Sequence, residues 1–101
     1  MSVSSQVSSD KKTVTINIDG RFDFSFQKEF REAYKNHNAP GLTYQVELSR
    51  TEYMDSSALG MLLLLKEHSD SHKGKIILKQ PSEAIKKILQ MANFNQQFEI
   101  A

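Results

Sequence analysis

Segments with two different hydrophobic periods alternate along this chain. Residues 13–19 and 42–49 place apolar side chains at every second position, whereas residues 25–37 and 81–92 space them three and four positions apart. A period of two is typical of a strand with one buried face, and a period near 3.6 of an amphipathic helix. Ser25 is expected to cap the first of these helices. Strands that alternate with helices predict a central sheet connected by helical crossovers.

Four further segments extend this pattern. Residues 56–70 predict a helix because they are rich in leucine and lack β-branched residues, and "KIILK" at 75–79 predicts a short strand. Residues 98–100 are expected to add an edge strand. The polar residues 1–12 predict either another edge strand or a flexible arm. We therefore predict a single α/β domain over residues 1–101, a sandwich with a central mixed sheet of four to five strands and about three to four helices.

Charge and composition exclude several classes of function. Thirteen Lys and Arg against twelve Asp and Glu leave a formal charge of +1, so no strongly basic surface for nucleic acid is expected. The chain has no cysteine, which excludes disulfides and thiolate sites. The longest apolar run, residues 61–65, is too short to span a membrane, and no signal peptide is apparent in the first dozen residues. We expect a soluble, cytoplasmic protein that binds neither nucleic acid nor membrane.

Three small polar residues precede the most apolar run of the chain. In "YMDSSALGMLLLL", Asp55, Ser56 and Ser57 fall where a strand passes into the helix predicted at 56–70. Ligands usually bind at the carboxyl ends of strands in α/β folds, and the positive N-terminus of a helix can accept a phosphoryl group on a serine. The same residues are also common helix caps. On these residues alone a cap is the favoured interpretation, and a regulated site is the alternative.

The predicted helix at 56–70 is apolar around most of its circumference. At about 100° per residue, Ala58 shares one arc with Met61 and Leu65, whereas Gly60 and Leu64 fall on the opposite side. Such a helix is either deeply buried or presents one face to another protein. Gly60 and Leu64 are therefore expected either to border a docking surface or to be covered by neighbouring elements.

No constellation typical of an enzyme is present in the sequence. His68 and His72 have a spacing compatible with a metal ion, but no carboxylate or cysteine nearby completes a site, and cationic residues are common at a helix C-terminus. No Gly-x-Ser-x-Gly elbow and no glycine-rich phosphate loop occur. We expect a protein without enzymatic activity, cofactor or metal.

The motif at the strand-to-helix junction resembles that of a known family. "YMDSSALG" at residues 53–60 is similar to the signature of STAS domains, in particular the free-standing anti-sigma factor antagonists, which carry Met-Asp-Ser-Ser/Thr-Gly-Leu-Gly. "GRFDF" at 20–24 resembles the Gly-Glu-Leu-Asp stretch of the family, and residues 81–100 are similar to its last helix, turn and strand. The resemblance covers nearly the whole chain and implies a STAS-type sandwich.

The resemblance also implies a mechanism of partner switching. In that family the unphosphorylated antagonist binds an anti-sigma factor, often itself a GHKL-type serine kinase, and thereby frees a sigma factor; a PPM-type serine phosphatase reverses the phosphorylation. The phosphorylated hydroxyl directly follows the motif aspartate and corresponds here to Ser56. Other STAS proteins are cytoplasmic subunits of lipid-transporting ABC complexes, which is the alternative function. The predicted partner-binding residues are Asp23, Asp55, Ser56, Ser57, Ala58, Gly60 and Leu64.

Two residues depart from the family pattern. Ala58 replaces the glycine of the motif, and its methyl group is expected to fit a helix while altering the approach of a kinase. Arg21 stands where the family usually has glutamate, so the surface near Asp23 carries a different charge. Neither departure removes the phosphorylatable hydroxyl.

Overall fold

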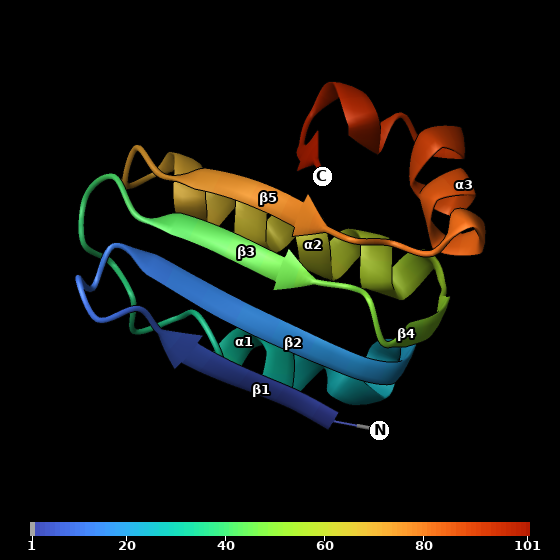
Figure 1. The fold of residues 1–101 in the computed structure, drawn as a ribbon, viewed down its shortest axis with the longest axis horizontal. Helices are drawn as coiled ribbons and strands as arrows, with labels where there is room; N and C mark the ends of the chain where they lie inside the picture. Colours follow the sequence, from blue (N-terminus) through green and yellow to red (C-terminus); the bar gives the residue numbers. More distant parts are fainter. Residues whose placement is uncertain (1) are drawn as a thin grey trace.

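A six-stranded mixed sheet forms the centre of the molecule in the computed structural model, which describes residues 2–101 (Figure 1). The strands follow the order β1-β2-β3-β5-β6, and β4 pairs with the end of β2. Only β1 runs antiparallel to its neighbour; the other pairs are parallel. The strands are Ser2–Val7 (β1), Thr13–Phe22 (β2), Thr43–Glu47 (β3), Thr51–Met54 (β4), Lys75–Lys79 (β5) and Glu99–Ile100 (β6).

Three α-helices and two 3₁₀ turns connect these strands. The helices α1 and α2 lie together on one face of the sheet, and α3 lies beside its carboxyl end (Figure 1). The predicted α/β architecture is thus confirmed. Of residues 1–12, which the sequence predicts as an edge strand or an arm, Ser2–Val7 form the strand β1, whereas residue 1 lies outside the described residues. The helical elements are Phe24–Phe26 (η1), Gln27–Glu32 (α1), Ser56–Asp70 (α2), Glu83–Met91 (α3) and Phe94–Gln96 (η2).

The hydrophobic core lies between the sheet and the helices α1 and α2, and Ile85 and Leu89 of α3 belong to the same cluster. Along β2, Val14, Ile16 and Ile18 are buried while the residues between them are half-exposed, as the period of two predicts. Phe30 of α1 and Leu62 of α2 are buried in the same cluster. The burial of these apolar faces, at roughly 25 cal/mol per Å² of apolar surface, is the main force that holds the helices on the sheet.

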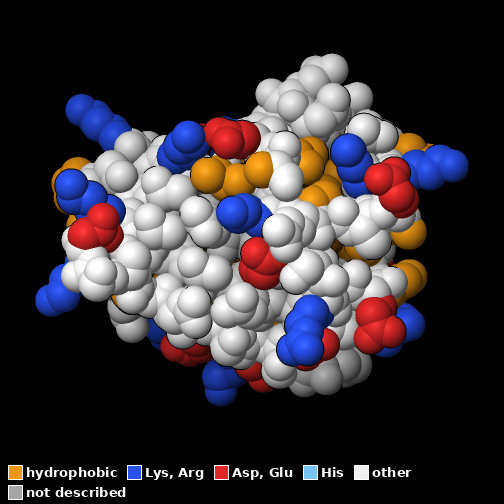
Figure 2. All heavy atoms as spheres, viewed as in Figure 1, with side chains coloured by type: hydrophobic (Ala, Val, Ile, Leu, Met, Phe, Trp, Pro, Cys, Tyr) orange, Lys and Arg blue, Asp and Glu red, His pale blue; other side chains and the backbone are white. Residues whose placement is uncertain are grey.

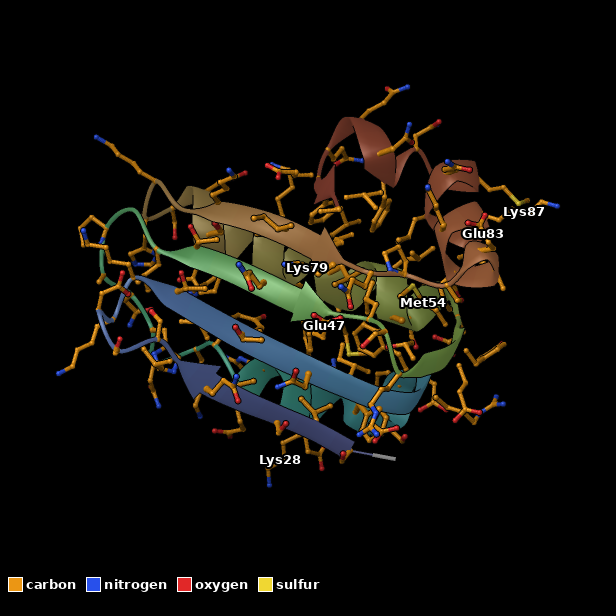
Figure 3. The ribbon with its side chains drawn as sticks, in the orientation of Figure 1. Lys28, Glu47, Met54, Lys79, Glu83 and Lys87 are labelled. Atoms are coloured by element: carbon orange, nitrogen blue, oxygen red, sulfur yellow. The ribbon has the colours of Figure 1, made fainter. Side chains whose placement is uncertain are left out.

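The opposite face of the sheet carries charged side chains of both signs. Figure 2 shows them interspersed on this side together with a group of hydrophobic side chains, and the half-exposed Ile77 of β5 belongs to this face. Glu47 of β3 and Lys79 of β5 face each other in the ladder and are both half-exposed (Figure 3). Opposite charges in facing positions favour the pairing of two strands.

Two elements differ from the sequence-based expectations. The helix expected over 25–37 is shorter, because α1 ends at Glu32 and residues 33–36 form turns. Ser25 does not cap it; Asp23 caps the preceding 3₁₀ turn. Strand β4 was not predicted as a separate element, since only its first and last residues are buried and its four residues do not alternate.

Two glycines in different surroundings allow a test of the packing. A Cβ at Gly74 would lie 2.6 Å from Ser69 Oγ and 2.8 Å from the carbonyl oxygen of Leu42, whereas a Cβ at Gly60 meets nothing within 4 Å. We expect Gly74→Ala to lower the free energy of unfolding by about 1–3 kcal/mol through overpacking. Gly60→Ala should instead raise it by about 0.5–1 kcal/mol, because alanine favours a helix interior. Urea denaturation of both variants measures the difference, and equal effects would contradict the described packing.

Candidate functional site

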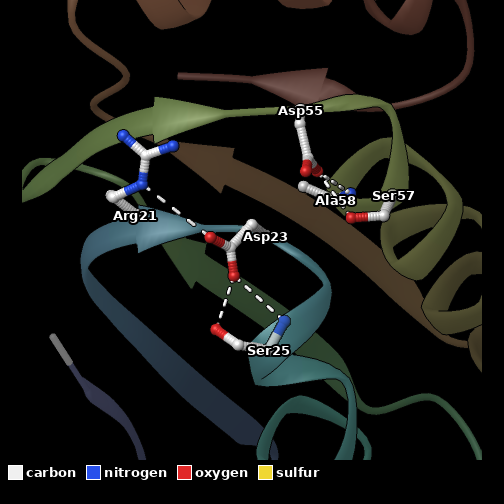
Figure 4. Close-up of polar contacts among 6 residues, drawn as sticks. All are labelled: Arg21, Asp23, Ser25, Asp55, Ser57 and Ala58. Atoms are coloured by element: carbon white, nitrogen blue, oxygen red, sulfur yellow. Dashed lines mark hydrogen bonds and ion pairs between the residues drawn. The ribbon is translucent and has the colours of Figure 1, made fainter.

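Two neighbouring parallel strands end in the same kind of turn. Phe22 of β2 pairs with Met54 of β4, and each is followed by an aspartate that caps the next helical element. Asp23 Oδ1 accepts the N–H of Ser25 at 3.0 Å, and Asp55 Oδ1 accepts the N–H of Ala58 at 3.0 Å (Figure 4). The structure thus brings two aspartates that are 32 positions apart in the sequence to one edge of the sheet.

The two adjacent serines of the motif have different environments. Ser57 is half-buried, and its hydroxyl donates a hydrogen bond to Asp55 Oδ1 at 2.6 Å. Ser56 is exposed at the first position of α2, and its hydroxyl forms no hydrogen bond with any other residue in the range 2–101. Ser57 therefore stabilises the turn, whereas the hydroxyl of Ser56 is available to another molecule.

Asp23 lies in a cluster of hydrogen-bond donors and positive charge. The hydroxyl and the backbone N–H of Ser25 lower the pKa of Asp23, and the guanidinium of Arg21, 3.8 Å away, lowers it further. Hydrogen bonds to the charged form favour ionisation. Asp23 is therefore a stable negative charge beside the Ser56 corner.

Arg21 joins the ends of the two strands. It faces Tyr53 in the β2–β4 ladder, and its guanidinium lies 4.2 Å above the centre of the Tyr53 ring. A cation–π contact at an exposed site contributes about 0.5–1 kcal/mol. The residue that departs from the family pattern thus has a structural role in holding β4 against β2.

An exposed phenylalanine in this region was not predicted from the sequence. Phe24 occupies, between Asp23 and Ser25, the position that Ser56 occupies between Asp55 and Ser57. Its side chain is 64% exposed. The helical spacing of the neighbouring aromatic residues indicates only core positions, and no local signal distinguishes Phe24 as a surface residue.

One flank of α2 is open, as the helical spacing allowed. Leu64 is 52% exposed and, together with Phe30, Tyr34 and Met61, lines a groove of about 730 Å³ between α1 and α2. Gly60 is exposed on the same helix. Of the two possibilities left by the sequence, the structure thus favours an uncovered surface around Gly60 and Leu64.

Ala58 requires a correction. It was included among the residues expected to contact a binding protein, but its side chain is 0% exposed and lies in the core. Its methyl group therefore cannot touch another molecule in this structure. Only its backbone N–H takes part in the site, as the group that Asp55 caps.

The histidines lie at the opposite end of α2. His68 Nε2 is 3.1 Å from the carbonyl oxygen of His37, and His72 Nδ1 is 2.9 Å from that of His68. Within residues 2–101, no three His, Cys, Asp or Glu side chains are placed to hold a metal ion. None of the helices in this range is long and apolar enough to cross a membrane.

Comparisons with known proteins agree with this architecture. The family model described as "Mlab, STAS domain" matches residues 5–100. A "STAS-domain containing protein" of Pseudomonas aeruginosa (strain UCBPP-PA14) is 42% identical to this chain over 101 residues, with 100% of both proteins covered.

Two solved structures share the fold. The anti-sigma factor antagonist SpoIIAA in its unphosphorylated form aligns with a TM-score of 0.82 at 21% identity, over 99% of this chain and 88% of that chain. The Bacillus cell fate determinant SpoIIAA in its phosphorylated form aligns with a TM-score of 0.69 at 21% identity, over 99% of this chain and 91% of that chain. The predicted STAS-type sandwich is thereby confirmed.

The hydrogen bonds of Asp23 predict a measurable effect on its titration. We expect Ser25→Ala to raise the pKa of Asp23 toward its ordinary value of 3.8, because the largest stabilisation of the carboxylate is lost. A carboxyl with a depressed pKa stabilises the fold above the unfolded pKa and loses this contribution as the pH falls through the folded pKa. Carboxyl NMR titration measures the shift, and Ser57→Ala is the control. An unchanged Asp23 titration in Ser25→Ala would contradict the assigned contacts.

Proposed function

The chain belongs to the STAS domain family, and we propose that it acts as an anti-sigma factor antagonist. It is a cytoplasmic binding module without enzymatic activity. When Ser56 is unphosphorylated, the domain binds an anti-sigma factor and frees a sigma factor. A serine kinase, which can be the anti-sigma factor itself, phosphorylates Ser56, and a phosphatase of the PPM type reverses the reaction.

The accessibility of Ser56 carries this proposal. Its side chain is exposed and unbonded, whereas Asp55 and Ser57 beside it are held in the turn by hydrogen bonds. A phosphoryl group can therefore be added to Ser56 without breaking a contact within residues 2–101. The turn keeps its geometry in both states, so a binding protein would meet the same backbone with a different charge.

The electrostatics of the corner allow a change of binding without a change of fold. Phosphorylation adds a charge of about −1.5 to −2, which the N-terminus of α2 stabilises. The phosphate also lies beside Asp55 and near Asp23, both acidic. A surface that packs against neutral Ser56 would have to desolvate this concentrated negative charge, which is costly without a cationic partner. Phosphorylation should therefore weaken the complex.

The surface around Ser56 offers apolar contacts for the anti-sigma factor. Phe24 is exposed on the adjacent turn, and Leu64 is exposed about two helical turns along α2. Gly60 lies between Ser56 and Leu64 along the same helix and adds no side chain above it. Aromatic and aliphatic anchors around a regulated polar residue are typical of a protein interface.

The similar structures support the regulatory part of the proposal. The anti-sigma factor antagonist SpoIIAA is known in an unphosphorylated and in a phosphorylated form. The alternative function, a subunit of a lipid-transporting ABC complex, predicts instead an association that does not depend on the state of Ser56.

Substitutions at Ser56 test the switch. Affinity purification from the native cell first captures the anti-sigma factor. Titration of this protein into the wild type, Ser56→Ala and Ser56→Asp then measures the three affinities. We expect Ser56→Ala to bind at least as tightly as the wild type, and Ser56→Asp to bind at least about tenfold more weakly, a loss of about 1.4 kcal/mol. Ser57→Ala is the matched control. The kinase should still phosphorylate this variant, whereas it should not phosphorylate Ser56→Ala. Capture of an ABC transporter ATPase irrespective of residue 56 would favour the alternative, and kinase labelling at Ser57 would reject the assigned residue.

Two neighbouring leucines test the binding surface. Leu64→Glu places a charge in the proposed interface, and we expect it to weaken the complex by at least about tenfold. Because Leu64 is 52% exposed, the free energy of unfolding of the Leu64→Glu variant should differ from that of the wild type by no more than about 0.5 kcal/mol. Leu63, 41% exposed and seven positions after Ser56, lies on the same face of α2 as Ser56, so Leu63→Glu should weaken the complex as well. Met91→Glu, at a side chain that is 78% exposed on α3, is the control. Calorimetric titration and urea denaturation measure both properties; a large loss of stability in Leu64→Glu would identify this residue as core.

A further inference from the structure

Strand β1 forms one edge of the sheet. It pairs with β2 along its whole length in a single register, from Ser2 opposite Asp19 to Val7 opposite Val14, without a bulge. On its other side no further strand or helix of the described chain follows (Figure 1). The main-chain groups along that side therefore have no strand to pair with.

The ladder shows which residues direct their main-chain groups to the open side. The N–H of Ser8 donates to the carbonyl oxygen of Thr13 at 2.9 Å, in continuation of the β1–β2 register. Main-chain groups alternate in direction along an antiparallel strand. The N–H and C=O groups of Val3, Ser5 and Val7 therefore point away from β2.

Strand β1 itself lacks most of the features by which proteins usually prevent strand pairing; the nearest charged side chains belong to α1, where Lys28, Glu29 and Glu32 border Val3 and Ser5. Residues 2–9 contain no charged side chain and no proline, and the register has no bulge. Exposed edges are normally protected by lysine, proline, bulges or a covering element. An uncharged and regular edge is instead suited to β-strand addition.

We propose that β1 pairs in antiparallel orientation with β1 of a second copy of this chain, about a two-fold axis at Ser5. An identical edge on both molecules gives an isologous interface, which closes as a dimer. With the axis at Ser5, this residue faces its counterpart, and Val3 of each copy faces Val7 of the other. All three outward-directed residues of each strand are then paired, whereas an axis at Ser4 would leave Val7 without a residue of β1 opposite it.

The side chains fit the same register. Val3, Ser5 and Val7 are opposite Ile18, Ile16 and Val14 in the ladder and thus lie on the core face of the sheet. Val7 is 44% exposed in the single chain. In the dimer, contact with Val3 of the second copy would cover it and extend the apolar layer across the axis.

The strength of the dimer is limited by the length of the strand. Pairing of two short edges buries less surface than a stable interface requires, so we expect a weak, concentration-dependent dimer. The proposal is independent of the state of Ser56 and of any anti-sigma factor, and its failure would leave the proposed function unaffected.

Sedimentation velocity over a range from about 10 μM to about 1 mM tests the pairing, since weak interfaces fall in this range. We expect dimer in the wild type and in Ser5→Ala, which keeps the backbone N–H. Ser5→Pro removes that N–H and should be monomeric throughout, while its circular dichroism spectrum stays that of the wild type, because this N–H makes no bond to β2. A monomeric wild type at the highest concentration, or a dimer that persists in Ser5→Pro, would overturn the proposal.

A second pair of variants avoids any effect of proline on folding. Ser5→Lys places two like charges opposite each other at the axis, which opposes pairing. Ser9→Lys adds the same charge in the turn after β1. We expect at least about a tenfold increase in the dissociation constant for Ser5→Lys alone. Equal effects of the two substitutions would contradict an axis at Ser5.

Discussion

The change of neighbour along β2 is the constraint on which the site depends. Residues 13–17 of this strand pair with β3, but from Gly20 onward it pairs with β4, with a register shift between Gly20 and Arg21. Gly20 adopts a φ of 94°, which favours glycine, and its N–H donates to the carbonyl oxygen of Arg50 at 2.9 Å. The buried Thr51 hydroxyl, 2.9 Å from the carbonyl oxygen of Ile18, closes the same junction. This arrangement brings the two capping aspartates together.

A cap and a regulated site are compatible at this corner. Asp55 caps α2 and also accepts the Ser57 hydroxyl, so the turn is stable without any contribution from the side chain of Ser56. The two interpretations that compete on the basis of the sequence therefore apply to different atoms. Stable neighbours hold one exposed hydroxyl in a constant position, which is what the proposed recognition by several proteins in turn would require.

More of the fold than of the candidate site could be predicted from the sequence. Hydrophobic periodicity reports which face of an element is buried, and it correctly separates Ala58 from Leu64 on α2. Periodicity does not predict β4, because the pairing of this strand depends on the register shift in β2. It does not predict the exposure of Phe24 either, because that depends on the direction that the chain takes in η1. The helical arc that Ala58 shares with Met61 and Leu65 predicts a buried side chain, which the structure confirms. The resemblance to the family motif alone predicted that Ala58 contacts a binding protein, and that prediction is wrong. Tertiary geometry, rather than local propensity, decides these cases.

Under the proposed function, the absence of hydrogen bonds between the Ser56 hydroxyl and the rest of residues 2–101 would have a consequence for the lifetime of the protein. A modification that neither forms nor breaks internal bonds leaves the balance between folded and unfolded molecules almost unchanged, apart from the small effect of the helix dipole. Exposure to cellular proteases would then be similar for both forms. The signal would be stored as a ratio of two equally durable species rather than as a change in abundance.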